Sequence, residues 1–255
     1  MQHYKFVRAA IFLIILCNAS SLFSQSWLKY SDSIYSNIKS SNDSKAREFL
    51  NLAEREINNS QVKIDTNYAD FLYRKGWVYK VEDNDPIIFW TESLEIWENS
   101  SVKNFYKIVR LYYNLGSAYN IKDYERANFH YEKCFEAYNM ERLEIDEIYN
   151  RTIYSLARNY YYYDLKKSKY YGNKYIELSE SDGYSDFDFR FANVHTYAGD
   201  KVKNESILLN YLNHYNAEKL KQPYLLLQIY SKLYSASYDL GKTKKAIEYA
   251  ERALE

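Results

Sequence analysis

The sequence has few of the residues that bend or cross-link a chain. Six Gly and two Pro occur among 255 residues, which disfavours an all-β fold, because strands need frequent turn residues, and favours helices. Two Cys are present, and Cys17 lies in an N-terminal segment that we expect to be removed. Cys134 then remains alone, so no intramolecular disulfide can form and stability must come from packing.

The chain also lacks net charge, since Lys plus Arg and Asp plus Glu both number 34. We therefore expect no nucleic-acid partner. The apolar run AAIFLIILC has only nine residues, too few to span a bilayer comfortably. It follows Lys5 and Arg8 and precedes a small polar stretch, which is the order of a secretory signal. We predict a signal peptide at residues 1–24, and hence a periplasmic or otherwise extracytoplasmic location.

What is present is a repeat of about forty residues. The segment YYNLGSAYNIKDYERANFHYEKCFEAY, residues 112–138, aligns with IYSLARNYYYYDLKKSKYYGNKYIELS, residues 153–179, at an offset of 41. Small residues recur near positions 46, 87, 127, 168, 206 and 246. In the second repeat this position falls on Pro86 or Ile87, and in the fifth on Glu205 or Ser206. Apolar residues return every three to four positions, so each repeat predicts two helices with one buried stripe each.

The repeat resembles the tetratricopeptide repeat (TPR) family over residues 27–255. The segments LGSAYNIKDYERANFHYEKCFEAY and YDLGKTKKAIEYAERALE match it best. The resemblance implies an all-α, right-handed solenoid of about six helix hairpins, because one hairpin cannot bury both of its faces. The family's typical period is about 34, and this one is longer. Long-period arrays behind a secretion signal are similar to the exported sensor regions of Bacteroidota signalling proteins.

No catalytic motif is found in the sequence. The patterns H-E-x-x-H, G-x-S-x-G and G-x-x-x-x-G-K-[ST] do not occur, and the histidines lack the spacing of metal ligands. The acidic stretch ESDGYSDFDF could supply oxygen ligands to calcium, but its spacing does not match an EF-hand, and we interpret it as a solvated loop. Cys134 falls on a predicted buried stripe. We therefore expect no enzyme activity, no cofactor and no metal.

The TPR resemblance places a binding groove on the first helix of each repeat. Aromatic rings and guanidinium groups recur there at equivalent positions and suit a peptide that carries carboxylates. The alternative is that a chain with 31 Tyr packs these rings between helices. The groove candidates are Tyr73, Trp77, Arg110, Tyr113, Arg151, Tyr154, Arg158, Tyr161 and Phe191.

The predicted function is an exported, non-enzymatic scaffold that binds a protein or peptide. One alternative is the extracytoplasmic sensor region of a membrane signal transducer, a histidine kinase or transcriptional regulator with its output domain beyond Glu255. An unrecognised enzyme is the other. The sixth repeat is incomplete and lacks a capping helix, so Ala246, Ala250 and Ala253 would present an uncovered stripe. We expect either a fragment of a longer chain, which could carry a membrane tether, or self-association through this end.

Overall fold

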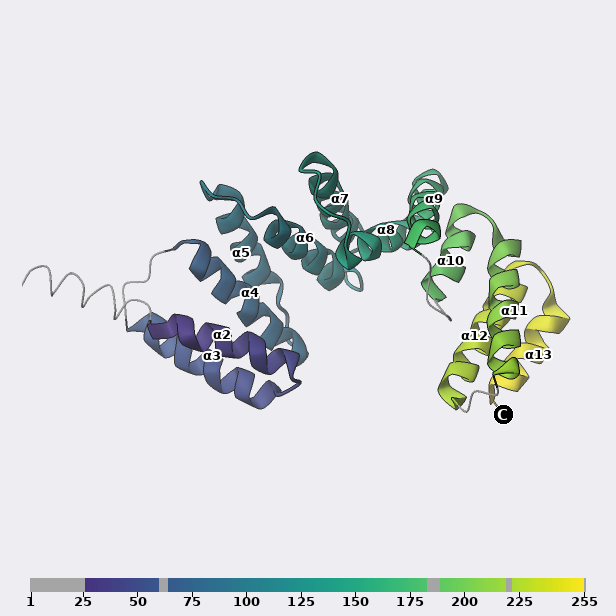
Figure 1. The fold of residues 1–255 in the computed structure, drawn as a ribbon, viewed down its shortest axis with the longest axis horizontal. Coiled ribbons are helices and arrows are strands. Elements are labelled where there is room, and N and C mark those ends of the chain that lie inside the picture. Colours follow the sequence, from purple (N-terminus) through teal and green to yellow (C-terminus); the bar gives the residue numbers. More distant parts are fainter. Residues whose placement is uncertain (1–25, 60–63, 183–188, 219–221, 255) are drawn as a thin grey trace, which may run out of the picture. The chain divides into compact units, whose positions relative to one another are not determined.

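The structure is a computed structural model that describes residues 26–59, 64–182, 189–218 and 222–254. These residues form helices and no strand (Figure 1). The helices pair into six successive hairpins, which confirms the predicted all-α fold class. The hairpins are α2 Ser26–Lys39 with α3 Asp43–Asn58, α4 Thr66–Val81 with α5 Ile87–Asn99, α6 Phe105–Tyr119 with α7 Tyr124–Met140, α8 Glu147–Tyr160 with α9 Leu165–Asp182, α10 Phe189–Ala198 with α11 Lys201–Ala217, and α12 Pro223–Asp239 with α13 Thr243–Leu254.

Side-chain caps explain why most of these helices begin where they do. A carboxylate or amide oxygen just before the first turn accepts backbone N–H groups that have no partner inside the helix. Asp65 Oδ1, for example, accepts from Asn67 N at 2.9 Å, and Asp146 Oδ1 accepts from Ile148 N at 2.9 Å. The same role is played by Asn42, Asn104, Asp123, Asp164 and Asp200.

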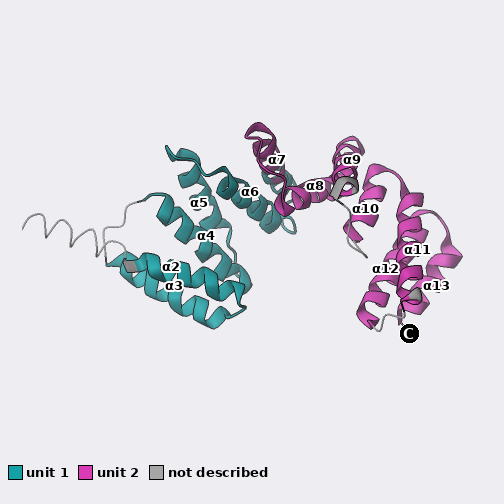
Figure 2. Cartoon of the chain, viewed as in Figure 1, with its two compact units in different colours: residues 1–130 teal, residues 131–255 magenta. Residues whose placement is uncertain are grey.

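The chain divides into two compact units, residues 1–130 and 131–255 (Figure 2). In unit 1 the core contains Trp27, Ile34 and Leu50 from the first hairpin, and Trp90 and Leu115 from the next two. Unit 2 has a core cluster in which α10, α11 and α12 bury aliphatic and aromatic side chains.

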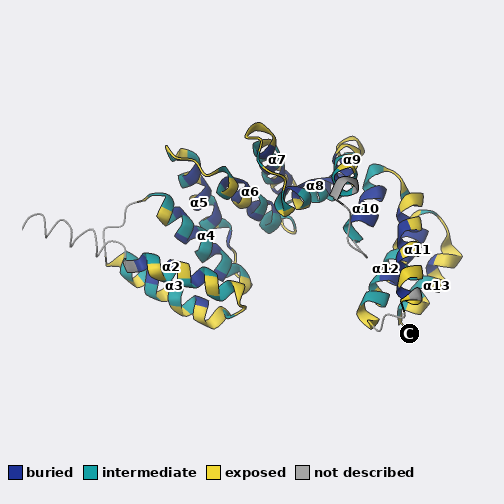
Figure 3. Ribbon diagram, in the orientation of Figure 1, coloured by how far each residue is buried: buried dark blue, intermediate teal, exposed yellow. Residues whose placement is uncertain are grey.

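In α8 and α12 the buried residues lie on one face, as the spacing predicts, and burial along the helices is drawn in Figure 3. The helix α4 differs from the prediction, because Ala69 and Leu72 are buried on one side of it and Phe71 and Val78 on the other.

Glycine permits the closest helix contacts. In unit 1 a Cβ added to Gly76 of α4 would lie 2.3 Å from Nε1 of Trp90 on α5. The indole fills this space and donates from Nε1 to the carbonyl oxygen of Tyr73 at 3.1 Å.

In the second hairpin Pro86 is buried at the start of α5, at one of the two positions that the repeat predicts. Ser93 of α5 is also fully buried, and its hydroxyl donates to the carbonyl oxygen of Ala69 on α4 at 2.7 Å.

In unit 2 the close approaches lie at or near positions of the predicted repeat. Ser168 of α9 is fully buried, and its hydroxyl hydrogen-bonds to the carbonyl oxygens of Ala157 at 2.9 Å and Tyr197 at 3.1 Å. Gly172 lies against the backbone of Ala198 on α10. Of the two residues expected at the fifth small position, Glu205 is buried and Ser206 is exposed.

Tyrosine rings carry much of the packing around α8 and α9. Phe135 stacks on Tyr149 with ring centroids 5.7 Å apart, and Tyr160 stacks on Tyr171 at 6.0 Å. The Tyr160 hydroxyl donates to Glu132 at 2.7 Å. Tyr162, two residues further on, is 82 % exposed. The run of four consecutive tyrosines is therefore divided between the core and the surface, because α8 ends at Tyr160 and the next three tyrosines lie in the turn before α9.

We predict that Gly76→Ala destabilises unit 1. The added methyl group has no room against the Trp90 ring, and overpacking of this kind costs about 1–3 kcal/mol. Urea unfolding followed by circular dichroism measures the change. Asn51→Ala on the exposed side of α3 is the matched control and should change stability by less than about 0.5 kcal/mol. Equal stability of Gly76→Ala and the wild type would show that the crossing is looser than described.

A buried carboxylate joins the last two hairpins of unit 2. The Glu205 side chain is 7 % exposed, accepts from Ser237 Oγ at 3.0 Å and pairs with Lys242 Nζ. Burial opposes ionisation of this carboxyl, but the hydrogen bonds from Lys242 and Ser237 outweigh it and hold its pKa below the usual value. The ionised pair thus stabilises the folded state at neutral pH.

We predict that Glu205→Gln lowers the free energy of unfolding by about 1–3 kcal/mol at neutral pH, because a charge-assisted hydrogen bond is lost inside the core. The wild-type contribution is complete above the ordinary glutamate pKa of about 4.3. This contribution to stability disappears as the pH falls through the lowered pKa that Glu205 has in the folded state. The difference in the free energy of unfolding between Glu205→Gln and the wild type should therefore become smaller in acid. Urea titrations at several pH values measure it. A difference independent of pH would contradict the assignment.

Candidate functional site

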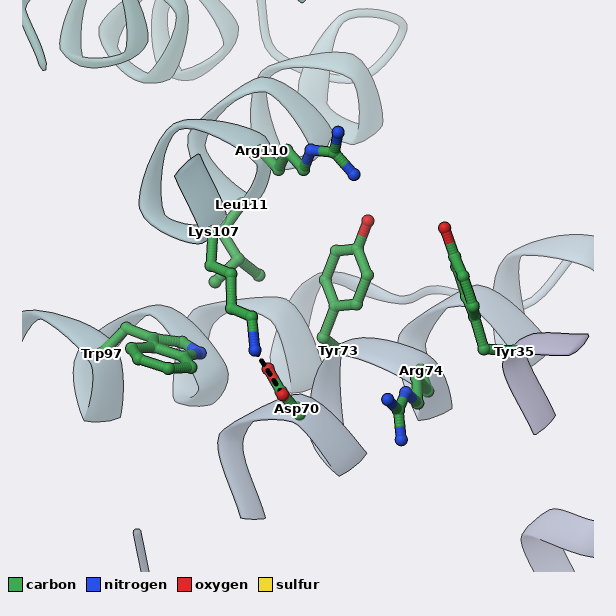
Figure 4. Close-up of a pocket in the computed structure, with 8 residues that line it drawn as sticks. All are labelled: Tyr35, Asp70, Tyr73, Arg74, Trp97, Lys107, Arg110 and Leu111. Carbon is green, nitrogen blue, oxygen red and sulfur yellow. Dashed lines mark hydrogen bonds and ion pairs between the residues drawn. The ribbon is translucent and has the colours of Figure 1, made fainter. Parts of the chain in front are cut away.

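A cavity with a volume of about 180 Å³ lies in unit 1. Four helices contribute to it: α2, α4, α5 and α6. Two of the predicted groove residues, Tyr73 and Arg110, line it. The full set is Tyr35, Asp70, Tyr73, Arg74, Trp97, Lys107, Arg110 and Leu111 (Figure 4).

Two of the three cations of this cavity already have acidic partners. Lys107 Nζ pairs with Asp70, the interaction drawn as a dashed line in Figure 4. Arg74 pairs with Asp32 at 2.9 Å and donates to Ser31 Oγ at 2.7 Å. Arg110 is exposed and forms no ion pair or hydrogen bond with the residues that the structure describes. The cavity therefore has one uncompensated positive charge, at the guanidinium group of Arg110.

Further hydrogen-bond donors lie close to this guanidinium group. The hydroxyl groups of Tyr35 and Tyr73 both point toward the side of the cavity on which Arg110 lies (Figure 4). Trp97 forms an apolar wall and is only 6 % exposed, and its buried Nε1–H has no hydrogen-bond acceptor among the described residues. A buried donor without a partner is costly. The cavity thus offers an excess of donors and few acceptors.

The other two candidates of unit 1 do not line this cavity. The Trp77 ring packs edge-on against Trp90, 5.5 Å between centroids, and against Tyr73 at 6.5 Å, and Lys80 Nζ lies 4.7 Å from its centroid. Tyr113 is half-buried on α6. Trp77 is thus chiefly a packing residue, as the alternative interpretation of the aromatic positions proposes.

In unit 2 the candidate arginines lie in different surroundings. Arg151 Nε pairs with Glu147 at 2.8 Å, and Arg190 Nη1 pairs with the same carboxylate at 2.8 Å. Arg158 is half-buried, and its Nη2 lies 3.5 Å from Asn159 Oδ1, at the limit of a hydrogen bond. Arg151 therefore does not offer a free guanidinium group to a partner.

The aromatic candidates of unit 2 mostly contact other rings. Tyr154 lies 5.8 Å from both Tyr175 and Tyr197, and Tyr161 lies 5.5 Å from Tyr197, measured between centroids. Phe191 is 2 % exposed and belongs to the core cluster of α10 to α12. Its placement in the groove is therefore corrected: the ring faces the core and is not accessible to a partner.

The sequence did not single out six residues of the cavity. Tyr35, Asp70, Arg74, Trp97, Lys107 and Leu111 lie outside the groove positions that the TPR resemblance supplies. Two signals could have indicated part of the set. Arg74 directly follows Tyr73, and Lys107 lies three residues before Arg110, so each shares a helix region with a named candidate.

Two groups outside this cavity have surroundings that suppress their reactivity. Burial raises the pKa of the Cys134 thiol to about 12 and keeps it protonated, with Sγ 3.4 Å from Thr152 Oγ1. Burial lowers the pKa of His130 to about 4, and its ring stacks on Tyr119. Within the described ranges no cluster of His, Cys, Asp and Glu could hold a metal ion.

Three solved structures show the same fold. The TPR-like repeats of a putative kinesin light chain from Podosopora anserina match with a TM-score of 0.60 and 9 % identity, over 75 % of this chain and 96 % of that one. A signal transduction ATPase with numerous domains and a TPR sensor, from Pyrococcus horikoshii, matches with a TM-score of 0.63 and 15 % identity. The match covers 88 % of this chain and 35 % of that one. A Rap protein complexed with competence and sporulation factor matches with a TM-score of 0.55 and 19 % identity. The match covers 90 % of this chain and 65 % of that one.

These likenesses support a TPR-like repeat fold for this chain. No known family profile matches the sequence, and no curated protein sequence matches it. In the part of the chain that the structure describes, no helix has the length and apolar character needed to cross a membrane. The predicted signal peptide at residues 1–24 lies outside the described residues, as does most of the acidic loop at residues 183–188.

We predict that Arg110→Ala leaves the fold and its stability nearly unchanged, within about 0.5 kcal/mol, because the side chain is exposed and has no described partner. Trp97→Ala, in the wall of the same cavity, should cost about 3–5 kcal/mol. Urea unfolding of both variants measures the two values. A large loss of stability in Arg110→Ala would show that this guanidinium group has a structural role and is not available for binding.

Proposed function

We propose that the chain is a non-enzymatic scaffold that binds a protein or peptide, and that the cavity of unit 1 holds one side chain or chain end of that partner. The cavity volume supports this choice. Sites for free small-molecule ligands usually have volumes of about 300–1,000 Å³, and this one has about 180 Å³. It has room for one side chain of a larger partner, whose other residues would contact the surrounding helices.

The charges of the cavity define the chemistry of that side chain. Asp70 is neutralised by Lys107, so the cavity does not present a free carboxylate. Arg110, Tyr35 and Tyr73 together can donate several hydrogen bonds toward one point. An aspartate, a glutamate or a C-terminal carboxylate accepts such bonds, and charge-assisted bonds to a guanidinium group are stronger than neutral ones. We therefore assign an acidic side chain or chain end to this cavity.

The comparison with known folds gives general support. The Rap structure is a complex with competence and sporulation factor, so a fold of this kind can carry a bound partner. A second candidate role is a sensor region, because the Pyrococcus horikoshii protein has a TPR sensor and this chain spans about a third of it. The full reading frame that contains this chain would decide, since a sensor requires an output domain.

Export is part of the proposal and rests on the sequence of residues 1–24 alone. A charged start, an apolar run of nine and a small polar end have the composition of a secretory signal. Mass spectrometry of the mature N-terminus from the native cell tests it.

We expect a display library of random peptides, selected on the full chain, to be enriched in peptides that contain Asp or Glu. Enrichment should be lost with Arg110→Ala, since the charge that neutralises the carboxylate is removed, and reduced with Tyr73→Phe. Arg142→Ala, which removes an exposed arginine from the loop between α7 and α8, is the control and should select the same peptides as the wild type.

The possible results separate the two parts of the proposal. If the wild type enriches no peptide, the scaffold function itself is contradicted. If peptides are enriched but lack acidic residues, or if Arg110→Ala selects the same set, the chain binds peptides and the cavity of unit 1 is the wrong site.

A further inference from the structure

Unit 2 carries a second surface feature, formed by the turns inside its hairpins. Three turn segments, residues 161–170, 199–203 and 239–247, together contain eight Lys, three Asp and no Arg or Glu. We call these three segments the basic edge. The loop between α7 and α8 in the same unit, residues 141–146, has three acidic residues and one basic residue. The positive charge is therefore concentrated at the turns that join the two helices of a hairpin.

Contacts between successive hairpins bring the three turns together. The Lys169 side chain lies over Gly199, since a Cβ added to that glycine would be 2.9 Å from Lys169 Cε. Lys201 Nζ lies 3.5 Å from the carbonyl oxygen of Asp239. The first turn therefore touches the second and the second touches the third, so the basic edge is one continuous surface.

Six of these eight lysines form no ion pair with any described residue. Lys167 pairs with Glu132, and Lys242 pairs with Glu205. The aspartates are partly occupied as well, because Asp164 and Asp200 accept backbone N–H groups at the starts of α9 and α11. The lysines that form no ion pair with any described residue are Lys166, Lys169, Lys201, Lys203, Lys244 and Lys245.

Apolar side chains stand exposed between the lysines. Leu165 is 58 % exposed and Val202 is 64 % exposed, and Ile247 and the rings of Tyr162 and Tyr163 are also exposed. An aqueous surface gains nothing from exposing a large aliphatic or aromatic side chain in each of three neighbouring turns. Lysines beside exposed aliphatic and tyrosine side chains are the combination found where proteins contact the headgroup region of a bilayer.

We propose that the basic edge of unit 2 binds an anionic lipid surface. The lysine ammonium groups contact lipid phosphates, and Leu165, Val202 and Ile247 enter the boundary between headgroups and acyl chains. A purely acidic polymer would neutralise the lysines but would leave three aliphatic side chains in water, whereas a lipid surface accommodates both. This association is peripheral and independent of the peptide cavity in unit 1.

The test uses the full chain and sedimentation with vesicles of phosphatidylcholine alone or with added phosphatidylglycerol. We expect binding to the anionic vesicles only, and weaker binding in high salt. The triple variant Lys166→Gln, Lys203→Gln, Lys244→Gln removes one unpaired lysine per turn. Each contributes about fivefold near an anionic surface, so the partition constant should fall about a hundredfold.

The matched control is Lys103→Gln, Arg142→Gln, Lys232→Gln, which removes the same charge from outside the basic edge and should bind like the wild type. The double variant Leu165→Ser, Val202→Ser tests the apolar part and should also bind more weakly. Circular dichroism checks the fold of each variant.

Four results would overturn the proposal: no binding to anionic vesicles, equal binding to phosphatidylcholine alone, equal loss in the edge and control variants, or unchanged binding of the edge variant. A further comparison uses immobilised polyglutamate. If the wild type binds polyglutamate but not anionic vesicles, and the edge variant does not bind polyglutamate, the basic edge binds acidic polymer and the lipid assignment is wrong.

Discussion

The packing of each helix hairpin on the next is the interaction on which the rest of the structure depends. A single pair of helices leaves one apolar face open, so the hairpins are stable only as neighbours in an array. The backbones come close where side chains are small or hydroxylated. Gly76 receives the Trp90 ring in unit 1, and Gly172 and the double hydrogen bond of Ser168 hold α8, α9 and α10 together in unit 2.

This constraint also determines where function can be located. Packing lowers the reactivity of two groups between the helices: burial keeps the Cys134 thiol protonated, and the half-buried His130 ring stacks on Tyr119. The two proposed binding surfaces use side chains that packing does not require. In unit 1 these are the guanidinium group of Arg110 and the tyrosine hydroxyls beside it, and in unit 2 the lysines of the hairpin turns. Because they consist of different residues, the two proposed surfaces can be altered separately.

The helices and the repeat could be predicted from the sequence, because the spacing of apolar and small residues follows directly from helix geometry. The candidate site could be predicted only in part. Tyr73 and Arg110 were found, but Tyr35 and Trp97 come from α2 and α5, and their distance from these residues depends on how hairpins stack. Phe191 was misassigned because an aromatic ring at a helical interval has the same sequence pattern in a core as in a groove.

The indole N–H signals in a nitrogen-15 spectrum give the most direct test of the peptide cavity, since the chain has only four Trp. Trp97 Nε1–H lies in the cavity wall and lacks an acceptor among the described residues, and Trp97→Phe assigns its signal. Adding an acidic peptide selected on the full chain should shift this signal more than the other indole signals, and Arg110→Ala should abolish the shift. An unchanged Trp97 signal with saturating, bound peptide would contradict the account, because the partner would then occupy another surface.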